Sequence, residues 1–548
     1  MRKICTLLLA MVFYSVTMAQ NWTWMTGNIN TVNHNGNWNV IGTEGSDFIS
    51  SRRGAAYWKD NQGRLWLFGG EFSSAGGTGQ FWSDMWRYNP TTNAWTWMKG
   101  PSMPSQPGTY GTKGVAAATN NPGCRAVAAC ATDNNGDFWM YGGFGYAATA
   151  GDDRLCDLWK YTVSTNTWTW MGGSSTGVGP TYGTMGTPSA TVEPGGRSEA
   201  NMWIVGNKIY IQGGIRGYNG IFGYTASDDM FSFDITTNQF TYIKGSSSNV
   251  VAMVTNTAGT ENATSTPGSR YAAHFWKDAS DNLWLFGGKR VTGQFDVGYA
   301  NDLWKFNPTT NNWTFVKGET TTNGTGTYGT LNTPAPTNMP RARSNTFGGA
   351  IGASQIIIFG GESTNINTLL NDAWMFDVVS NNWTWIGGTN TTNNFSSAAN
   401  FVFRVESATA SPQALSAGAS YIMPNGDLWL IAGWGLGNTS TRGFKSTVWR
   451  YRTSAIALPV SIQSFSGRIT NQTTTLHWQT GTEINAQQFE VEYSTNGANF
   501  TKVHTIPARN LNGSSYTATH TIANAAKHYY RLKMIDKDGS FTYSTVVI

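Results

Sequence analysis

Four short apolar runs separated by turn residues form a unit that recurs along most of the chain. In its clearest copy the runs cover residues 270–277, 283–288, 302–307 and 313–317. Apolar runs of this length bounded by Asn, Asp, Gly and Pro are typical of β-strands. Residues 278–282 supply the first turn, and Asn307-Pro308 opens the last one. The pattern therefore predicts four strands joined in sequence.

A glycine doublet ends the second strand of each copy. Successive doublets lie about 72 residues apart, at Gly69-Gly70, Gly142-Gly143, Gly213-Gly214, Gly287-Gly288 and Gly360-Gly361, with the variant Ala432-Gly433 in the sixth copy. A fixed period of this length indicates a repeat architecture. Four antiparallel strands repeated around an axis make the blade of a β-propeller.

The third and fourth strands carry repeated aromatic motifs. The third reads Asp-x-Trp-x-(Tyr/Phe), as at residues 302–306, and the fourth reads Trp-x-(Trp/Phe), as at residues 313–315. Together with the doublet, these motifs resemble the kelch repeat over nearly all of residues 21–454. The resemblance implies an all-β chain with a kelch β-propeller. Kelch propellers serve as binding platforms and occasionally as enzymes, so the function has to be argued from the site.

The number of blades follows from the fourth-strand motif, which occurs six times. Its first copy, Trp22-Thr-Trp24, precedes every other strand, and the last repeat stops after its third strand at residues 447–452. We expect residues 21–27 to pair beside residues 449–452 and to close a ring of six blades. Closure would remove two exposed strand edges, which otherwise invite aggregation.

Large aromatic residues recur at one position of the third strand. We interpret them as core, because neighbouring blades must fill the wedge between their faces, and we expect the doublet glycines to leave room for the rings. The residues are Trp86, Trp159, Trp304, Trp374 and Trp449.

Arginine at the start of the first strand and aspartate at the start of the third recur in five copies. They are Arg53, Arg125, Arg197, Arg270 and Arg343 with Asp84, Asp157, Asp229, Asp302 and Asp372. The sixth copy has Leu415 and Thr447 instead. This joint loss of charge favours Arg–Asp pairs within or between blades, because a lone buried charge is costly. The alternative is functional, since these arginines resemble those lining the channel mouth of kelch propellers that bind acidic peptides.

Loop lengths predict which face carries the function. The connections between first and second strands and between third and fourth strands are tight, whereas the other two classes are long and emerge on the same face. Three of the long loops share Tyr-Gly-Thr, at Tyr110, Tyr182 and Tyr328, which indicates a common conformation. Aromatic and basic residues on the long loops are our candidates for ligand binding, namely Trp82, Arg216, Tyr218, Tyr224, Lys289, Arg290 and Trp434. The alternative is that these rings pack their own loops.

The candidate site suits an extracellular glycan or a surface protein. Aromatic rings offer flat apolar faces, and arginine offers planar donors for carboxylates. The net charge is only +5, and no basic stripe is present, so nucleic acid is not expected. We expect a monomer with no cofactor and no metal.

Enzymatic chemistry is the alternative function. A copper oxidase of the galactose oxidase type would need converging ligands, and His34 and His274 are not expected to meet. A propeller similar to sialic-acid epimerases would need arginine and acid/base groups, and Glu71 and Glu362, directly after glycine doublets, are candidates. Cys124, Cys130 and Cys156 are expected to be buried thiols, with a Cys124–Cys156 disulfide as the alternative.

The two ends of the chain predict export and a second domain. Residues 1–19 have the basic start and apolar run of a cleaved signal peptide, and no other stretch is long and apolar enough to span a membrane. After a linker at 455–460, residues 461–548 read as short strands of a β-sandwich with Trp478 and Tyr530 in its core. This segment resembles the fibronectin type III-like module of proteins exported by type IX secretion in Gram-negative bacteria. The resemblance implies a secreted or cell-surface protein.

Overall fold

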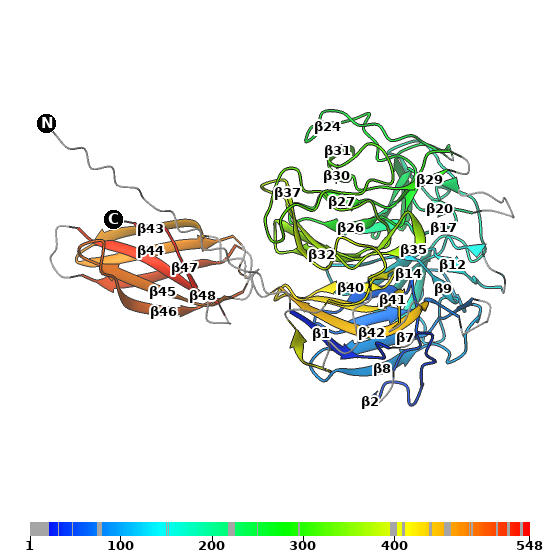
Figure 1. Ribbon diagram of the computed structural model, residues 1–548, viewed down its shortest axis with the longest axis horizontal. Helices are drawn as coiled ribbons and strands as arrows, with labels where there is room; N and C mark the ends of the chain where they lie inside the picture. The colour runs from blue at the N-terminus through cyan, green and yellow to red at the C-terminus, as the bar shows by residue number, and fades with distance from the viewer. Residues whose placement is uncertain are drawn as a thin grey trace.

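The computed structural model describes residues 21–547, except residues 31, 46–47, 74–78, 150, 152, 218–224, 249, 294–295, 395–402, 408–410, 438–440, 454–461, 482, 484–485, 511–512, 523–526 and 537–540. The expected signal peptide and linker therefore lie outside the described residues. Where the chain is described, its regular structure is all-β, in many small antiparallel sheets (Figure 1). A helix long and apolar enough to cross a membrane is not found among these residues.

Residues 21–452 contain six sheets, each built on four antiparallel strands and numbered here in chain order. Sheet 1 contains β3 (Ala56–Lys59), β4 (Leu65–Phe68), β7 (Met85–Asn89) and β8 (Ala94–Lys99). Sheet 2 contains β10 (Ala129–Thr132), β11 (Phe138–Tyr141), β14 (Leu158–Thr162) and β15 (Thr167–Gly172). Sheet 3 contains β18 (Asn201–Val205), β19 (Lys208–Gln212), β22 (Met230–Asp234) and β23 (Gln239–Lys244).

The remaining three sheets follow the same order of strands. Sheet 4 contains β26 (His274–Lys277), β27 (Leu283–Phe286), β30 (Leu303–Asn307) and β31 (Asn312–Lys317). Sheet 5 contains β32 (Phe347–Ile351), β33 (Gln355–Phe359), β36 (Ala373–Asp377) and β37 (Asn382–Gly387). Sheet 6 contains β40 (Ala419–Ile422), β41 (Leu428–Leu436), β42 (Arg442–Arg452) and, from the other end of the chain, β1 (Asn21–Thr26).

Strand β1 completes sheet 6 by pairing antiparallel with β42. Trp22 lies opposite Tyr451, and Trp24 lies opposite Trp449. The pairing expected from the displaced fourth-strand motif is therefore confirmed. Trp22 is 1% exposed and packs against Phe359 of sheet 5, so the displaced strand also joins two sheets.

The first strands of the six sheets contact one another in a closed cycle, from β3 through β10, β18, β26 and β32 to β40 and back to β3. Just before each of these strands, one residue donates its backbone N–H to the equivalent carbonyl oxygen of the preceding sheet, over 2.6–3.1 Å. Gly54 donates to Ala417, which completes the cycle. We call these residues the axial ring: Gly54, Val127, Glu199, Ala272, Asn345 and Ala417. All six have positive φ, between 52° and 63°, a conformation that is rare for residues other than glycine.

The axial ring interrupts the strands that the sequence predicts. The single strand expected over 270–277 is wrong, because the positive φ of Ala272 divides it into β25 (Arg270–Tyr271) and β26. The short first parts pair with ribbons formed by the long loops after the glycine doublets. The first parts are β9 (Arg125–Ala126), β17 (Arg197–Ser198), β25 and β39 (Leu415–Ser416). The ribbon strands are β5 (Glu71–Phe72), β6 (Gln80–Phe81), β12 (Phe144–Gly145), β13 (Asp153–Arg154), β20 (Ile215–Arg216), β21 (Thr225–Ala226), β28 (Lys289–Val291), β29 (Val297–Tyr299), β34 (Glu362–Ser363) and β35 (Asn365–Leu369).

Hydrophobic clusters lie between every two neighbouring sheets, including sheets 6 and 1. The repeated third-strand tryptophans are at most 3% exposed, which confirms them as core. The role expected for the doublet glycines is different, however. A Cβ on Gly142 would lie 2.5 Å from the backbone oxygen of Arg197, and Gly143 donates its N–H to that oxygen over 2.9 Å. The doublets therefore admit the backbone of the next sheet rather than an aromatic ring.

The outer strand of every sheet is also paired. In four sheets a long loop adds a fifth strand beside the fourth, namely β2 (Glu44–Gly45), β16 (Pro188–Ser189), β24 (Glu261–Asn262) and β38 (Glu406–Ser407). In sheets 2 and 5 single bridges from Ala117 to Trp168 and from Ala335 to Trp383 do the same. Covering the outer edges in this way protects them from pairing with other chains.

Residues 462–547 form two further antiparallel sheets around a core of their own. One sheet contains β43 (Ile462–Thr470), β44 (Thr473–Thr480) and β47 (Ser515–Thr521). The other contains β45 (Ala486–Ser494), β46 (Thr501–Pro507), β48 (Tyr529–Asp536) and β49 (Phe541–Tyr543). Residues of both sheets share one hydrophobic cluster, in which Trp478 and Tyr530 are each 2% exposed. Their expected place in the core is confirmed.

Candidate ligand site at one end of the axis

In sheets 1 to 5, a buried arginine–aspartate pair joins the segment just before the axial ring to the start of the third strand. The pairs are Arg52–Asp84, Arg125–Asp157, Arg197–Asp229, Arg270–Asp302 and Arg343–Asp372, with N–O distances of 2.6–2.8 Å and side chains at most 1% exposed. Each pair joins two residues of the same repeat. In sheet 1 the partner of Asp84 is Arg52. The prediction that Arg53 is the repeated arginine of this sheet is therefore wrong. The two arginines are adjacent, and only Arg52 lies 17 residues before its doublet, as Arg125 does.

Each pair is part of a larger hydrogen-bonded group. The arginine also donates to the backbone oxygen of the first doublet glycine, over 2.8–3.1 Å. In four sheets the tryptophan two residues after the aspartate donates its indole N–H to the carboxylate. Burial alone would raise the pKa of Asp157, but the charge and hydrogen bonds of Arg125, together with the hydrogen bonds from Tyr110 and Trp159, lower it. These groups leave the aspartate fully bonded, as a buried charge requires.

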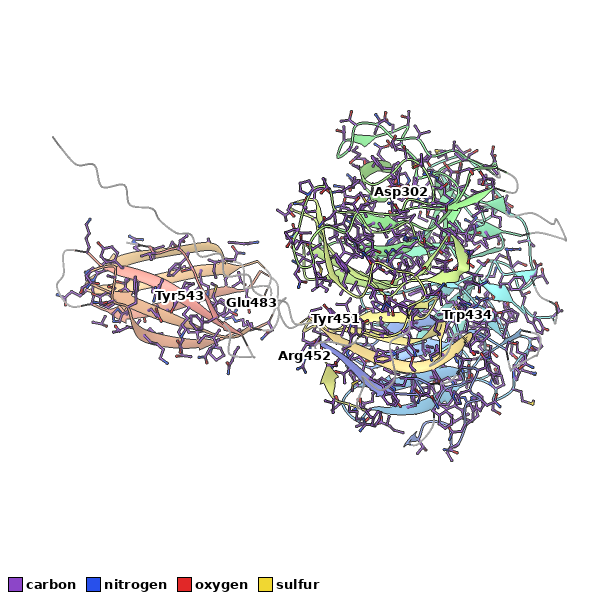
Figure 2. The ribbon with its side chains drawn as sticks, in the orientation of Figure 1. Asp302, Trp434, Tyr451, Arg452, Glu483 and Tyr543 are labelled. Atoms are coloured by element: carbon purple, nitrogen blue, oxygen red, sulfur yellow. The ribbon has the colours of Figure 1, made fainter. Side chains whose placement is uncertain are left out.

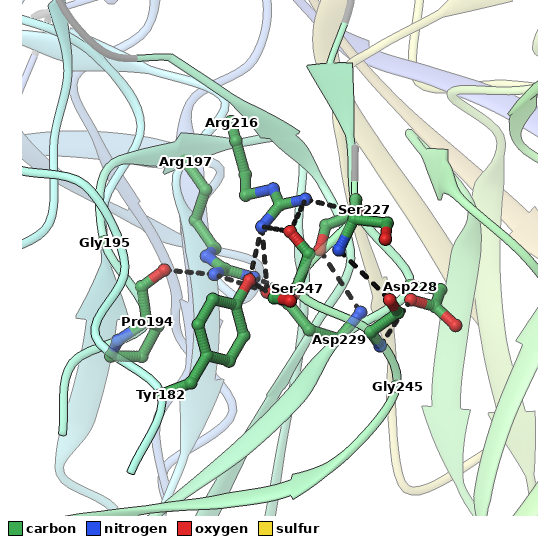
Figure 3. A network of polar contacts seen from close by, with 12 residues as sticks. Tyr182, Pro194, Gly195, Arg197, Arg216, Ser227, Asp228, Asp229, Gly245 and Ser247 are labelled. Carbon is green, nitrogen blue, oxygen red and sulfur yellow. Dashed lines mark hydrogen bonds and ion pairs between the residues drawn. The ribbon is translucent and has the colours of Figure 1, made fainter. Parts of the chain in front are cut away.

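The Tyr-Gly-Thr loops complete three of these groups. The hydroxyl groups of Tyr110, Tyr182 and Tyr328 donate to Asp157, Asp229 and Asp372 over 2.5–2.7 Å. In sheet 3 a phenylalanine, Phe231, stands where the other sheets have the donating tryptophan, and Arg216 lies beside the pair (Figure 3). Arg216 lies 3.6 Å from Asp229 and donates to the Tyr182 hydroxyl and to the Ser248 carbonyl.

Three of the seven candidate ligand-binding residues are buried rather than exposed on the loops. Trp82, Arg216 and Arg290 are 4%, 7% and 5% exposed. Trp82 packs on Trp38, and Arg290 donates to the Thr320 carbonyl over 2.7 Å and lies 3.9 Å from Asp302. These side chains therefore support the loops and the buried pairs. Tyr218 and Tyr224 lie outside the described residues.

The other two candidates lie with several charged residues around the axial ring. Figure 2 labels Trp434 and Tyr451 at opposite ends of sheet 6, and Trp434 marks the end that carries the long loops. We call the group there the mouth cluster. It draws on all six sheets and comprises Arg53, Glu71, Arg154, Glu199, Lys289, Asn345, Glu362 and Trp434.

Two ion pairs organise the mouth cluster. Arg53 binds Glu71 over 2.8 Å, with both side chains about one quarter exposed, and its guanidinium carbon lies 5.5 Å from the Trp434 ring centroid. Lys289 binds Glu362 over 3.2 Å. Glu362 is 2% exposed and also accepts from the Asn345 side chain over 2.6 Å. The residue directly after the glycine doublet thus belongs to the mouth cluster in four sheets, as Glu71, Lys289, Glu362 and Trp434.

Glu199 of the axial ring differs from the other carboxylates of the mouth cluster. Its Oε2 atom is buried and has no hydrogen-bond partner within the part of the chain that the structure describes. Burial raises the pKa of Glu199, and Lys289 acts in the opposite direction. For Lys289, burial opposes the charge, but Glu362 and Glu199 outweigh it and raise the pKa. A buried carboxylate oxygen without a hydrogen bond is costly, so Oε2 is a candidate acceptor for a ligand that reaches it.

The remaining chemistry predicted from the sequence is limited. Cys124, Cys130 and Cys156 are buried, and no disulfide joins any of them among the described residues, which confirms the thiol interpretation. Glu71 and Glu362, the candidate acid/base groups, both belong to the mouth cluster. No group of three or more His, Cys, Asp or Glu side chains suited to a metal is present in the described ranges.

Sequence reasoning missed the axial ring and Glu199. A signal for them exists, because each ring residue lies two positions after the repeated arginine or its Leu415 counterpart. The residue after each axial-ring residue is always small, namely Ala, Thr or Gly. No family model matches the chain, and no curated protein resembles it significantly.

Proposed function

We propose that residues 20–454 form a six-bladed β-propeller of the kelch type, closed by strand β1. The cyclic contacts of the first strands, the hydrogen bonds of the axial ring and the pairing of β1 with β42 support this architecture. In a propeller each repeat is one blade, and its first strand lines the axis. The two sheets of residues 462–547 suit a fibronectin type III-like module, as the sequence resemblance implies.

On this scaffold the protein is a secreted or cell-surface binding protein that recognises an extracellular glycan at the mouth cluster. The observation that carries this proposal is the convergence of Arg53, Glu199 and Lys289 around the axis, with an unsatisfied acceptor on Glu199. Sugar hydroxyl groups donate and accept hydrogen bonds, so they can use both the carboxylate oxygen and the cationic donors. The Trp434 ring beside them offers an apolar face to sugar C–H groups.

An array experiment tests the binding proposal. Full-length mature protein is applied to glycan and peptide arrays, and the glycans it retains are titrated with wild type, Arg53→Ala and Arg64→Ala. Arg64 is a matched control, since its side chain is 24% exposed and its Nε atom lies 2.6 Å from Asp60 Oδ2. This pair does not belong to the mouth cluster. We expect Arg53→Ala to weaken binding at least about tenfold, because a hydrogen bond to a charged group contributes about 1.5–3 kcal/mol. Equal binding by wild type and Arg53→Ala would refute the site, and retention on peptides alone would identify a protein ligand.

A second candidate function is an acid/base reaction on an acidic sugar, similar to sialic-acid epimerases. It is favoured by two carboxylates in unlike surroundings: Glu199, whose Oε2 has no hydrogen-bond partner among the described residues, and Glu362, which is held by Lys289 and Asn345. Unlike surroundings let one carboxyl group serve as acid and another as base. Incorporation of solvent deuterium into acidic sugars, followed by NMR with wild type and Glu199→Gln, distinguishes this enzyme from a binding protein.

A further inference from the structure

The axis contains two chambers, and the second lies away from the mouth cluster. An upper chamber of about 110 Å³ is walled by the axial ring and the residues just after it. A lower chamber of about 410 Å³ is walled by residues of the first strands of all six sheets. Tyr57, His274 and Phe275 belong to both walls and therefore divide the two chambers.

The lower chamber has the size and wall of a small-molecule site. Its volume lies within the range of about 300–1,000 Å³ that is usual for such sites. Trp58, Trp203, Trp276 and Tyr421 contribute to the wall, and each is at most 6% exposed. In sheet 5 the wall is made by Gly348, Gly349 and Ala350, so one side of the chamber lacks large side chains.

A hydrogen-bond acceptor lies at the inner end of this chamber. His274 is 6% exposed, and its Nε2 atom has no hydrogen-bond partner among the described residues. Burial lowers the pKa of His274 to about 4, so the ring is neutral near pH 7. In a neutral imidazole one ring nitrogen is an acceptor, and the unbonded Nε2 can take this role. Nε2 itself is buried, and a Cβ on Gly348 would lie 3.0 Å from it, so a residue larger than glycine would crowd this atom.

Positive charge lies at the outer end. Lys59 and Lys277 are the last residues of β3 and β26, and both line the chamber. Lys277 pairs with Asp281, whereas the ammonium group of Lys59 donates to the Ile422 carbonyl, and burial lowers its pKa. The described lining residues include no Asp or Glu. A ligand with an anionic end would therefore face lysine without a competing carboxylate.

We propose that the lower chamber binds a small aromatic carboxylate that carries a hydroxyl group at its far end. The hydroxyl donates to His274 Nε2, the ring packs among the tryptophans, and the carboxylate meets Lys59. The distance suits such a molecule. Lys59 ends β3 as Lys277 ends β26, and His274 lies three residues before Lys277, so the rise along the axis from His274 to the level of Lys59 is about 10 Å at about 3.3 Å per residue. This site is separate from the mouth cluster and does not depend on the function proposed there.

Calorimetric titration of the full-length mature protein with two probes tests the proposal. The probes are 3-(4-hydroxyphenyl)propionate and 3-phenylpropionate, which differ only in the hydroxyl group. We expect the hydroxylated probe to bind about three- to tenfold more tightly, the usual effect of one hydrogen bond. His274→Phe should abolish this difference while 3-phenylpropionate binds as before. Lys59→Met should weaken both probes at least about tenfold, whereas Lys208→Met, at an exposed lysine outside the chamber, should leave both unchanged.

A blocking variant keeps the test decisive if His274→Phe alters folding. Thr132 lines the chamber, is exposed and ends β10, so Thr132→Trp should close the outer end and abolish binding of both probes. The proposal is overturned if neither probe binds the wild type. It is also overturned if binding survives Thr132→Trp, or if a folded His274→Phe variant still prefers the hydroxylated probe.

Discussion

The five arginine–aspartate pairs and the mouth cluster show two uses of charge in one molecule. The pairs recur at one position of five sheets, are at most 1% exposed, and are completed by backbone carbonyl acceptors and aromatic side-chain donors. The charges of the mouth cluster differ from sheet to sheet, range from the buried Glu362 to the quarter-exposed Arg53 and Glu71, and include one Glu199 oxygen with no hydrogen-bond partner among the described residues. Charged residues that recur in every one of five repeats stabilise the sheets. Charged residues that differ between repeats lie together in the mouth cluster.

The largest expected effect is the difference in unfolding free energy between two arginine variants, one from the buried pairs and one from the mouth cluster. Arg270→Ala leaves Asp302 buried without its partner, and breaking a buried pair typically costs about 3–5 kcal/mol in the free energy of unfolding. Arg53→Ala breaks a pair whose side chains are about one quarter exposed, and such pairs contribute about 1 kcal/mol or less. Urea unfolding of the two variants measures the contrast. Equal losses of stability would mean that the two groups do not differ as described.

His274 provides a second test, because it stands at a position where the other sheets have Ala, Asn or Phe. Its pKa is lowered by burial from 6.5 to about 4, so the folded protein binds fewer protons than the unfolded chain between these values. Stability should therefore be lost as the pH falls from about 6.5 to about 4, by up to about 3 kcal/mol at about 1.4 kcal/mol per pH unit. His274→Phe should lack this loss in unfolding experiments across the same pH range. Parallel curves for the two proteins would contradict the burial of a neutral ring.

The same contrast explains how far the sequence could be used. Features that repeat, such as the strands, the tryptophan core and the paired charges, are predicted because each copy supports the others. The error at Arg53 arose where two arginines adjoin and the period alone distinguishes them. The long-loop residues Trp82, Arg216 and Arg290 were expected on the surface, but their burial depends on which loops meet in space. The repeat period of the sequence does not predict contacts between these loops.

Departures from the repeat are harder to interpret from one sequence. Glu199 stands in its copy where the others have Gly, Val, Ala or Asn, and nothing local marks it as buried. The positive φ of the axial ring is likewise set by hydrogen bonds between sheets, which are distant in sequence. A comparison of the copies with one another, position by position, would have identified the one carboxylate in this ring. Its burial required the structure.

Glu199→Gln should give the smallest effect, and its sign is the informative part. Because burial raises the pKa of Glu199 above its ordinary value of 4.5, the folded protein holds a proton there that the unfolded chain releases. Stability of the wild type should therefore fall as the pH rises from the unfolded value through the folded one. Glutamine carries no charge, so the variant should gain about 1 kcal/mol over wild type near pH 8 and nothing near pH 4. Unfolding free energies across this range measure the gain.

Glu71→Gln is the matched control, since it breaks the pair with Arg53 and should not stabilise the protein at any pH. A Glu199→Gln variant less stable than wild type near pH 8 would show that the carboxylate has partners in the folded protein and is not held ready for a ligand.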